Sequence, residues 1–321
     1  MNIIRTIAVS LVAASGLASA AQDMPPSPIR MLVGYAPGGA NDAVARIIST
    51  PLQAQTNSTI VVENKPGGGS TLATNEMAKA APTGQVLLMG STGGQAIAPS
   101  IYSKLPYDAI KDVQPVALVS NSAIAIVVND ALPVKNVREL INHAKQNPGK
   151  LNVSSPGNGT GSHLAGELFK SMAGIAMAHV PYRGDAPAMQ DVMAGVAHLT
   201  FASLPSAISA MQSGRVRIIA VTGPRRVAQL QDVPTVSESG LPTYEVLTWY
   251  GMFTTGGTPA PVVNRLASEI GAVLRQPAVR DAILKLGMEP APSTPEEFSR
   301  IVKHDMERWG KVVRSVGISV D

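Results

Sequence analysis

The sequence predicts an α/β fold of two lobes, each with a parallel sheet and its own hydrophobic core. Short β-rich runs alternate with helical patterns along most of the 321 residues, an order that is typical of βαβ units. Loops rich in glycine or serine follow several of the strand-like runs. About 300 residues remain behind a predicted export signal, which is enough chain for two lobes.

Residues 1–20 are predicted to form a cleavable signal peptide. Arg5 supplies a positive charge, residues 6–17 are apolar, and residues 18–20 (Ala-Ser-Ala) fit the small-residue cleavage rule. The apolar run is too short for a spanning helix, so a membrane anchor is the weaker alternative. The chain has no cysteine, which excludes disulfides, a thiol nucleophile and a lipid-modified cysteine anchor. We therefore expect a soluble protein of the Gram-negative periplasm, with full secretion as the alternative.

The periodicity predicts the individual elements in order. Strands are expected at 29–33, 59–63, 86–89, 116–119, 123–128, 151–154, 179–182, 199–202, 218–222 and 246–253. Val44, Ile48 and Leu52 give the first helix an apolar face, and Pro51 is expected to end or kink it near residue 49. The C-terminal third is predicted to be helical, with a capping box at 294–297 and Trp309 in the core.

A glycine-rich elbow follows the first predicted strand. It comprises Tyr35, Ala36, Pro37, Gly38 and Gly39, and Asp42 follows in the first turn of the helix. Such an elbow directs free backbone N–H groups and the positive end of a helix dipole at one point, which favours binding of an anion. Similar loops lie at 65–70, 90–94, 154–162 and 183–185. The carboxyl ends of parallel strands form ligand clefts in open α/β folds, so we expect a cleft between the lobes there.

The sequence gives little support to a catalytic, metal or nucleotide site. The chain has no Gly-x-Ser-x-Gly elbow, and an exported hydrolase that uses Ser155 or Thr160 stays open only as the alternative from another class. His163 and Glu167 stand one helical turn apart, but without a His-Glu-x-x-His motif we expect a surface pair and no metal site. Loop 157–161 and Glu63 resemble parts of a nucleotide site, yet the Gly-x-Gly-x-x-Gly order is missing, and no cofactor is expected.

The charge pattern also argues against nucleic acid as a partner. The formal net charge is only +4, no dense block of lysine and arginine occurs, and aromatic residues make up 4% of the chain. A nucleic-acid surface normally combines a basic stripe with stacking aromatics. The mild positive balance is compatible with small acidic ligands. Arg183-Gly184-Asp185 is expected to be a turn, in which Arg183 either faces a ligand carboxylate or stays in solvent.

Five segments resemble one known family in the same order along the chain. They are 61–69 (Val-Val-Glu-Asn-Lys-Pro-Gly-Gly-Gly), 105–108 (Leu-Pro-Tyr-Asp), 180–184 (Val-Pro-Tyr-Arg-Gly), 204–207 (Leu-Pro-Ser-Ala) and 233–236 (Val-Pro-Thr-Val). This is the Bug family, the periplasmic substrate-binding proteins of tripartite tricarboxylate transporters. The resemblance covers essentially the whole chain after the signal peptide.

The resemblance implies a type II periplasmic binding fold with two crossing strands, which we expect near 115–128 and 244–253. Lobe 1 would comprise 21–120 and 247–321, and lobe 2 would comprise 121–246. The lobes would close on a small carboxylated organic solute without turnover and deliver it to a permease or a sensor. A monomer is expected. The effector domain of a transcription factor shares this architecture, but the export signal and the missing helix-turn-helix disfavour it.

The same resemblance implies which residues bind the ligand. The loop residues are Tyr35, Ala36, Pro37, Gly38, Gly39, Asp42, Ser91, Thr92, Ser155, Gly157, Asn158, Gly159, Thr160, Tyr182, Arg183 and Ala202. Many relatives carry an acid where this chain has Ala202. If that acid contacts an ammonium group, its absence favours a ligand without an amine.

Overall fold

The computed structural model describes residues 24–318, and the predicted signal peptide lies outside this range. Its core is a curled, mixed sheet of ten strands with the order β2-β1-β3-β9-β4-β7-β5-β6, and β8 and β10 also pair with β4. The strands are β1 (Ile29–Val33), β2 (Ile60–Asn64), β3 (Val86–Ser91), β4 (Val113–Asn129), β5 (Asn152–Ser155), β6 (Ala178–Pro181), β7 (Leu199–Ser203), β8 (Val216–Val221), β9 (Leu247–Thr255) and β10 (Glu289–Pro290).

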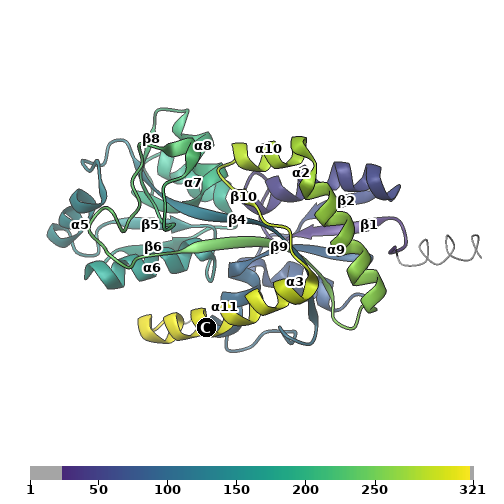
Figure 1. Ribbon diagram of the computed structural model, residues 1–321. Coiled ribbons are helices and arrows are strands. Elements are labelled where there is room, and N and C mark those ends of the chain that lie inside the picture. Colours follow the sequence, from purple (N-terminus) through teal and green to yellow (C-terminus); the bar gives the residue numbers. More distant parts are fainter. Residues whose placement is uncertain (1–23, 319–321) are drawn as a thin grey trace, which may run out of the picture.

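The sheet has two halves that share one long strand (Figure 1). In one half β1 pairs in parallel with β2 and β3, and in the other β5 pairs in parallel with β6 and β7. The 17-residue strand β4 runs through both halves. Over 113–123 it pairs with β9, and over 124–129 it pairs with β7 and β8, always antiparallel. The fold class predicted from the sequence is confirmed at this level.

Most predicted strands agree with the structure to within two residues at each end, but two predicted strands form one. The runs 116–119 and 123–128 are both parts of β4. Polar residues Ser120–Ser122 break the apolar pattern, which suggested a loop. They stay extended because Asn121 and Ser122 pair with Trp249 and Thr248 of β9.

The helices cover both faces of the sheet (Figure 1). They are α2 (Ala40–Thr56), α3 (Thr71–Ala78), α4 (Ala98–Ile101), α5 (Val137–Gln146), α6 (Gly161–Ala173), α7 (Asp185–Met193), α8 (Leu204–Met211), α9 (Ala260–Arg275), α10 (Pro277–Lys285) and α11 (Pro295–Val316). Helices α2, α9 and α10 bury one apolar cluster of the first half, and α7 and α8 bury another in the second half. A third cluster joins α3, α5, α6 and α11, so α11 packs beneath both halves.

The prediction for Pro51 is wrong in one respect, because α2 does not end there. The helix continues to Thr56, although proline lacks the N–H of a regular turn. Ile48 before the proline and Leu52 after it are both fully buried in the same core cluster. Packing of this continuous apolar face outweighs the local penalty of roughly 3 kcal/mol.

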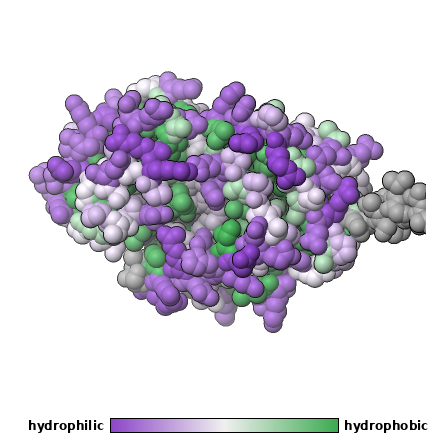
Figure 2. Space-filling view, viewed as in Figure 1, coloured by the Kyte–Doolittle hydropathy of each residue, from purple (hydrophilic) through white to green (hydrophobic). Residues whose placement is uncertain are grey.

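The predictions for the C-terminal helix are confirmed. Thr294 Oγ1 accepts a hydrogen bond from the Glu297 N–H at 3.2 Å, and the Glu297 carboxylate accepts one from the Thr294 N–H at 2.9 Å, which completes the capping box. Trp309 is only 1% exposed. Hydrophilic side chains cover most of the face shown in Figure 2 and leave small apolar patches. None of the helices among residues 24–318 has the length and apolar character that a membrane crossing requires.

Candidate ligand-binding site

The predicted elbow connects β1 to the first turn of α2. A side chain at Gly34 would meet Ser70 Oγ at 2.0 Å, so the close approach of these two loops requires glycine. Asp42 accepts hydrogen bonds from the Gly38 N–H at 3.1 Å and from Asn64 Nδ2 at 3.0 Å, and it pairs with Arg46. Burial acts to raise the pKa of Asp42, but these hydrogen bonds outweigh it and lower that pKa. Asp42 therefore braces the elbow as a carboxylate.

The second predicted loop connects β5 to α6. Thr160 is the N-cap of α6, where its Oγ1 accepts a hydrogen bond from the His163 N–H at 3.2 Å and donates one to the Gly157 carbonyl at 2.8 Å. Gly157 lies at φ +139° and Gly159 at φ +73°, backbone conformations that favour glycine. The loop is therefore held by its own hydrogen bonds and presents the N-terminus of α6.

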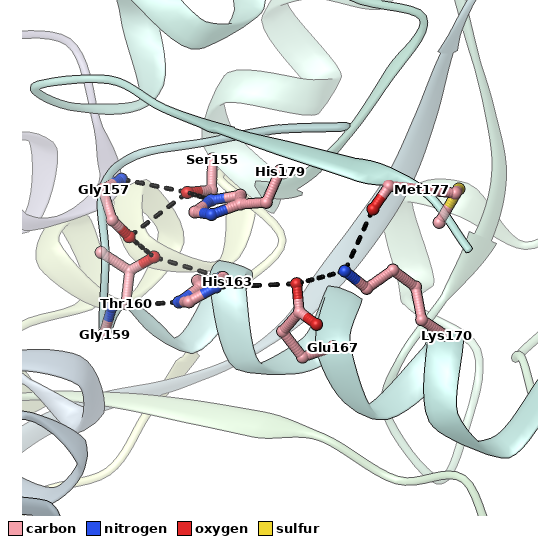
Figure 3. A network of polar contacts seen from close by, with 9 residues as sticks. All are labelled: Ser155, Gly157, Gly159, Thr160, His163, Glu167, Lys170, Met177 and His179. Atoms are coloured by element: carbon pink, nitrogen blue, oxygen red, sulfur yellow. Dashed lines mark hydrogen bonds and ion pairs between the residues drawn. The ribbon is translucent and has the colours of Figure 1, made fainter. Parts of the chain in front are cut away.

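Two stacked histidines lie beside this loop and contact it (Figure 3). The rings of His163 and His179 lie 3.9 Å apart at an angle of 14°. His163 Nδ1 accepts the Gly159 N–H at 3.2 Å, and His179 Nε2 lies 2.6 Å from Ser155 Oγ. Burial is the main cause that lowers the pKa of His163 to about 3 and that of His179 to about 4, with Lys170 adding repulsion in both cases. Both rings are neutral near pH 7.

The expectation of a surface pair at His163 and Glu167 is wrong. His163 is 7% exposed and the Glu167 side chain 15%, because the first stacks on His179 and the second forms an ion pair with Lys170 at 2.6 Å. The sequence spacing showed that these side chains share a helix face. It did not show that β6 covers that face.

The contact between Ser155 and His179 is a structural feature of the loop. Ser155 is 1% exposed, and its Oγ also accepts the Gly157 N–H at 3.2 Å. His179 has a stacked histidine beside it, where a catalytic histidine would have an orienting carboxylate. Ser155 also lies outside the cavity described next. This geometry gives the hydrolase alternative no accessible nucleophile at position 155.

A small cavity lies between the two halves, where the N-termini of several helices converge. Its lining residues are Tyr35, Asn41, Ser91, Ile124, Pro156, Thr160, Gly161, Ser162, Asp185, Ser203, Thr248 and Tyr250. Asn41 belongs to the first turn of α2, Gly161 and Ser162 to that of α6, Asp185 begins α7, and Ser203 is the N-cap of α8. The cavity holds about 30 Å³, which is room for about two water molecules.

The electrostatics of this cavity favour an anion without a positively charged side chain. The first N–H groups of a helix have no partner within the helix and carry its positive dipole end. Among residues 24–318, no lysine or arginine lines the cavity, and Asp185 is the one acidic side chain in its lining. Burial raises the pKa of the Tyr35 and Tyr250 phenols, which stay protonated, and the Tyr35 hydroxyl already donates to the Gly69 carbonyl at 3.3 Å. A carboxylate can be held here by dipoles and neutral donors, with no salt bridge to desolvate.

The two halves are in direct contact around the cavity. The Ala36 N–H donates to the Arg183 carbonyl at 3.2 Å. A side chain at Gly184 would meet Ala36 Cβ at 3.1 Å, and one at Gly69 would meet the Asn158 carbonyl at 2.3 Å. Beyond these contacts a groove of about 320 Å³ includes Tyr35, Gly157, Asn158, Tyr182 and Arg183. Tyr35 and Pro156 line both spaces, so the groove and the cavity are neighbours.

The structure brings together many of the predicted site residues, although in different roles. Those that line the cavity or the groove are Tyr35, Ser91, Gly157, Asn158, Thr160, Tyr182 and Arg183. Ala36 and Gly39 contact the second half, and Pro37 and Gly38 are exposed at the elbow. Elbow N–H groups are partly used already, since Ala36 and Gly38 both donate to protein acceptors.

Other predicted residues do not reach the cavity. Asp42 braces the elbow, Ser155 and Gly159 bind the histidine pair, and Thr92 Oγ1 accepts the Trp249 N–H at 2.9 Å. Ala202 is 2% exposed and packs in the apolar cluster with Ala125. Its neighbour Ser203 lines the cavity in its place.

Six lining residues with polar side chains were not predicted from the sequence: Asn41, Ser162, Asp185, Ser203, Thr248 and Tyr250. The first four lie at the starts of helices, but the anion-binding property of helix N-termini was applied in the sequence analysis only to the elbow. Thr248 and Tyr250 alternate on β9, the strand predicted to cross between the lobes. Polar residues at helix starts and on the crossing strand were thus the available signals.

A larger cavity of about 670 Å³ lies elsewhere, between the segments 223–231 and 284–289. Arg225 and Glu289 close part of it with an ion pair at 2.6 Å. The α-helix N-termini of the smaller cavity do not line this space, and its two arginines, Arg225 and Arg226, are each paired with a carboxylate, Glu289 and Glu238.

The chain is similar to known proteins along nearly its whole length. The family model described as tripartite tricarboxylate transporter family receptor matches residues 44–318. Protein BugT of Bordetella pertussis is 30% identical over 322 residues, which cover 99% of both chains.

Two solved structures share the fold closely. A Rhodopseudomonas palustris protein with adipate superimposes with a TM-score of 0.89 at 31% identity and covers 92% of this chain and 99% of its own. MatC of the same organism with bound malate has a TM-score of 0.86 at 30% identity and covers 90% of this chain and 100% of its own. The predicted two-lobe type II binding fold and the resemblance to Bug proteins are thereby confirmed. The chain belongs to the family of tripartite tricarboxylate transporter receptors.

Proposed function

We propose that this protein is a periplasmic solute-binding protein that captures a small carboxylated solute between its lobes and delivers it to a tripartite permease or a sensor. The observation that carries the proposal is the cavity between the halves, where the N-termini of α2, α6 and α8 converge without any lysine or arginine. Such a convergence favours a carboxylate through dipoles and N–H donors. Relatives that share the fold are described with adipate and malate.

Capture requires the halves to separate and close again. The cavity of about 30 Å³ is too small for any organic acid, and contacts such as that between Ala36 and Arg183 cover it. Strands β4 and β9 are the continuous connections that pass between the halves. A hinge at 121–124 and 246–249 would separate lobe 1 (21–120 and 247–321) from lobe 2 (121–246) and admit the solute.

The proposal includes no catalytic turnover. The family comprises receptors, and the Ser155 hydroxyl is buried outside the cavity. The proposed partners are therefore the solute and inner-membrane permease subunits, with the protein acting as a monomer exported by its signal peptide. A strain that lacks the protein should lose uptake of the bound acid. Unchanged uptake would contradict the transport role and leave a sensory one.

Binding is tested by thermal unfolding of the mature protein with a panel of mono-, di- and tricarboxylates and amino acids. A ligand at about a hundred times its Kd stabilises the folded state by about 2.7 kcal/mol. Native mass spectrometry of the purified protein detects an acid that co-purifies. A flat panel together with an empty protein would contradict the proposal.

A matched pair of variants locates the site. Ser162→Asp places a negative charge in the first turn of α6 at the cavity, where the helix dipole favours the fold but the charge repels a ligand carboxylate. Ala260→Asp makes the same change in the first turn of α9, which is exposed and remote from the cavity. The proposal predicts loss of binding in the first variant and unchanged binding in the second. Equal binding in both would contradict the assigned site.

A further inference from the structure

Asp185 occupies the place in the cavity where an anion is expected. It is the first residue of α7, and its carboxylate accepts the Ser203 N–H at 3.4 Å and the Ser203 hydroxyl at 3.0 Å. The Ala40 N–H, at the start of α2 in the other half, lies near enough to lower the pKa of this carboxyl group. A side chain at Gly39 would come within 2.9 Å of Asp185 Oδ2. One side chain of the second half is thus bound at the N-terminus of a helix of the first half.

The geometry points to Asp185 as an internal anion that determines the charge of the solute. It takes the place of one carboxylate of a dicarboxylic acid, so this chain selects a solute with a single carboxylate whose other end is an uncharged donor or an ammonium group. This inference rests on the proposed function and names the class of solute that the same cavity accepts.

The partners of Asp185 suit a carboxylate in its anionic form. Each group that contacts it is a donor: two come from Ser203 at the start of α8, and one comes from Ala40 at the start of α2. Burial raises the pKa of Asp185 above its usual value, and these donors offset only part of that rise. No lysine or arginine lines the cavity to neutralise a second anion nearby.

The remaining donors leave room for one ligand carboxylate. The first turn of α6, with Gly161 and Ser162, faces the same cavity and has no acidic residue. Tyr250 adds a protonated phenol, whereas the Tyr35 hydroxyl already donates to the Gly69 carbonyl at 3.3 Å. A solute carboxylate at α6 would be balanced by helix dipoles, but a second one beside Asp185 would meet a like charge in a poorly solvated space.

This arrangement bears on the missing acid at position 202. From the sequence, the missing acid at position 202 was expected to favour a ligand without an amine. In the structure Ala202 packs in the core, and Asp185 supplies a carboxyl group to the cavity. An ammonium group therefore has a counter-charge in this site. The relatives described with adipate and malate hold dicarboxylic acids, so the inference predicts that this chain differs from them.

The test compares acids of equal length that differ only at one end. Calorimetric Kd values are measured for 4-hydroxybutyrate, 4-aminobutyrate and succinate, and for 6-hydroxyhexanoate, 6-aminohexanoate and adipate. Each acid is tested with the wild type, with Asp185→Asn and with Asp185→Ser. Asp281→Asn is the control, because it removes an exposed carboxylate from α10, away from the cavity. Thermal unfolding without ligand verifies that each variant folds, and the serine variant replaces the asparagine variant if the amide disturbs the site.

The inference predicts that the wild type prefers a hydroxy or amino acid over the dicarboxylate of equal length by about tenfold or more. Both Asp185 variants should lose this preference and gain affinity for the dicarboxylate, while the Asp281 variant should match the wild type. Equal binding of both classes by the wild type overturns the inference and leaves the proposed function standing. Failure of the wild type and all variants to bind any of these acids or the wider panel contradicts the proposed function itself.

Discussion

The stacked histidines predict that the protein loses stability in mildly acidic solution. His163 and His179 have pKa values of about 3 and about 4 in the folded state, against 6.5 for an unperturbed histidine. A histidine whose pKa is lowered by folding contributes stability that is complete above pH 6.5. This contribution is lost as the pH falls towards the folded value, since the unfolded chain binds the proton more tightly.

The size of the loss follows from these values. Between pH 7 and pH 5 each unfolded histidine becomes protonated while its folded counterpart stays neutral, which costs roughly 2 kcal/mol for each ring and about 4 kcal/mol together. Protonation cannot be accommodated locally. His163 Nδ1 accepts the Gly159 N–H, the rings stack at 3.9 Å, and Lys170 lies nearby. The Glu167 carboxylate lies 3.7 Å from His163 Nε2, but it is already paired with that lysine at 2.6 Å.

Urea denaturation at constant ionic strength between pH 7.5 and pH 5 measures this loss. The double variant His163→Asn with His179→Gln keeps acceptors for the Gly159 and Ser155 contacts but cannot take up the protons. It should be nearly insensitive to pH over the interval, apart from groups it shares with the wild type. His304→Gln, on the exposed face of α11, is the control and should retain the wild-type slope. A wild-type stability that is flat from pH 7 to pH 5, or an unchanged slope in the double variant, would refute the reasoning.

Four further substitutions test the capping, the packing and the loop hydrogen bonds of the fold. Thr294→Ala removes the capping box of α11 and should lower the free energy of unfolding by about 1 kcal/mol, as measured by urea denaturation. An unchanged free energy of unfolding would contradict a stabilising role of this cap. Gly251→Ala places a methyl group 2.2 Å from Phe298 Cζ and should lower the free energy of unfolding by about 1–3 kcal/mol. Gly271→Ala, inside α9, is the control and should leave the free energy of unfolding unchanged or raise it. Equal effects of the two substitutions would contradict the close packing of Gly251 against Phe298. Ser155→Ala should lower the free energy of unfolding by about 1–2 kcal/mol, because the hydroxyl contacts with His179 and Gly157 are lost. If the variant instead kept its stability and lost an ester-hydrolysis activity of the wild type, the enzyme alternative would be supported.

Local pattern was sufficient to predict most of the elements. The alternation of strands and helices indicated parallel sheets, and the Thr294 capping box marked the start of α11 correctly. Local rules failed where packing overrides them. Leu52 lies in the core beyond Pro51 and keeps α2 intact, and pairing with β9 keeps Ser120–Ser122 extended within β4.

The site was predicted in outline because loops at strand ends carry a recognisable composition. Its details depend on contacts between segments far apart in sequence. Asp185 was interpreted as a turn residue, but it reaches the N-terminus of α2 because the halves close around it. His163 was interpreted as half of a surface pair with Glu167, yet α6 and β6 bring its ring against that of His179. Neither contact follows from the spacing of residues along one helix or one strand.

A crystal structure of the complex with the tightest-binding carboxylate tests the central claim most directly. The account predicts that the halves enclose the ligand, with its carboxylate at the N-terminus of α6 beside Thr160 and Ser162 and its other end facing Asp185. Ligand in the larger cavity beside Arg225, or on the outer surface, would contradict it.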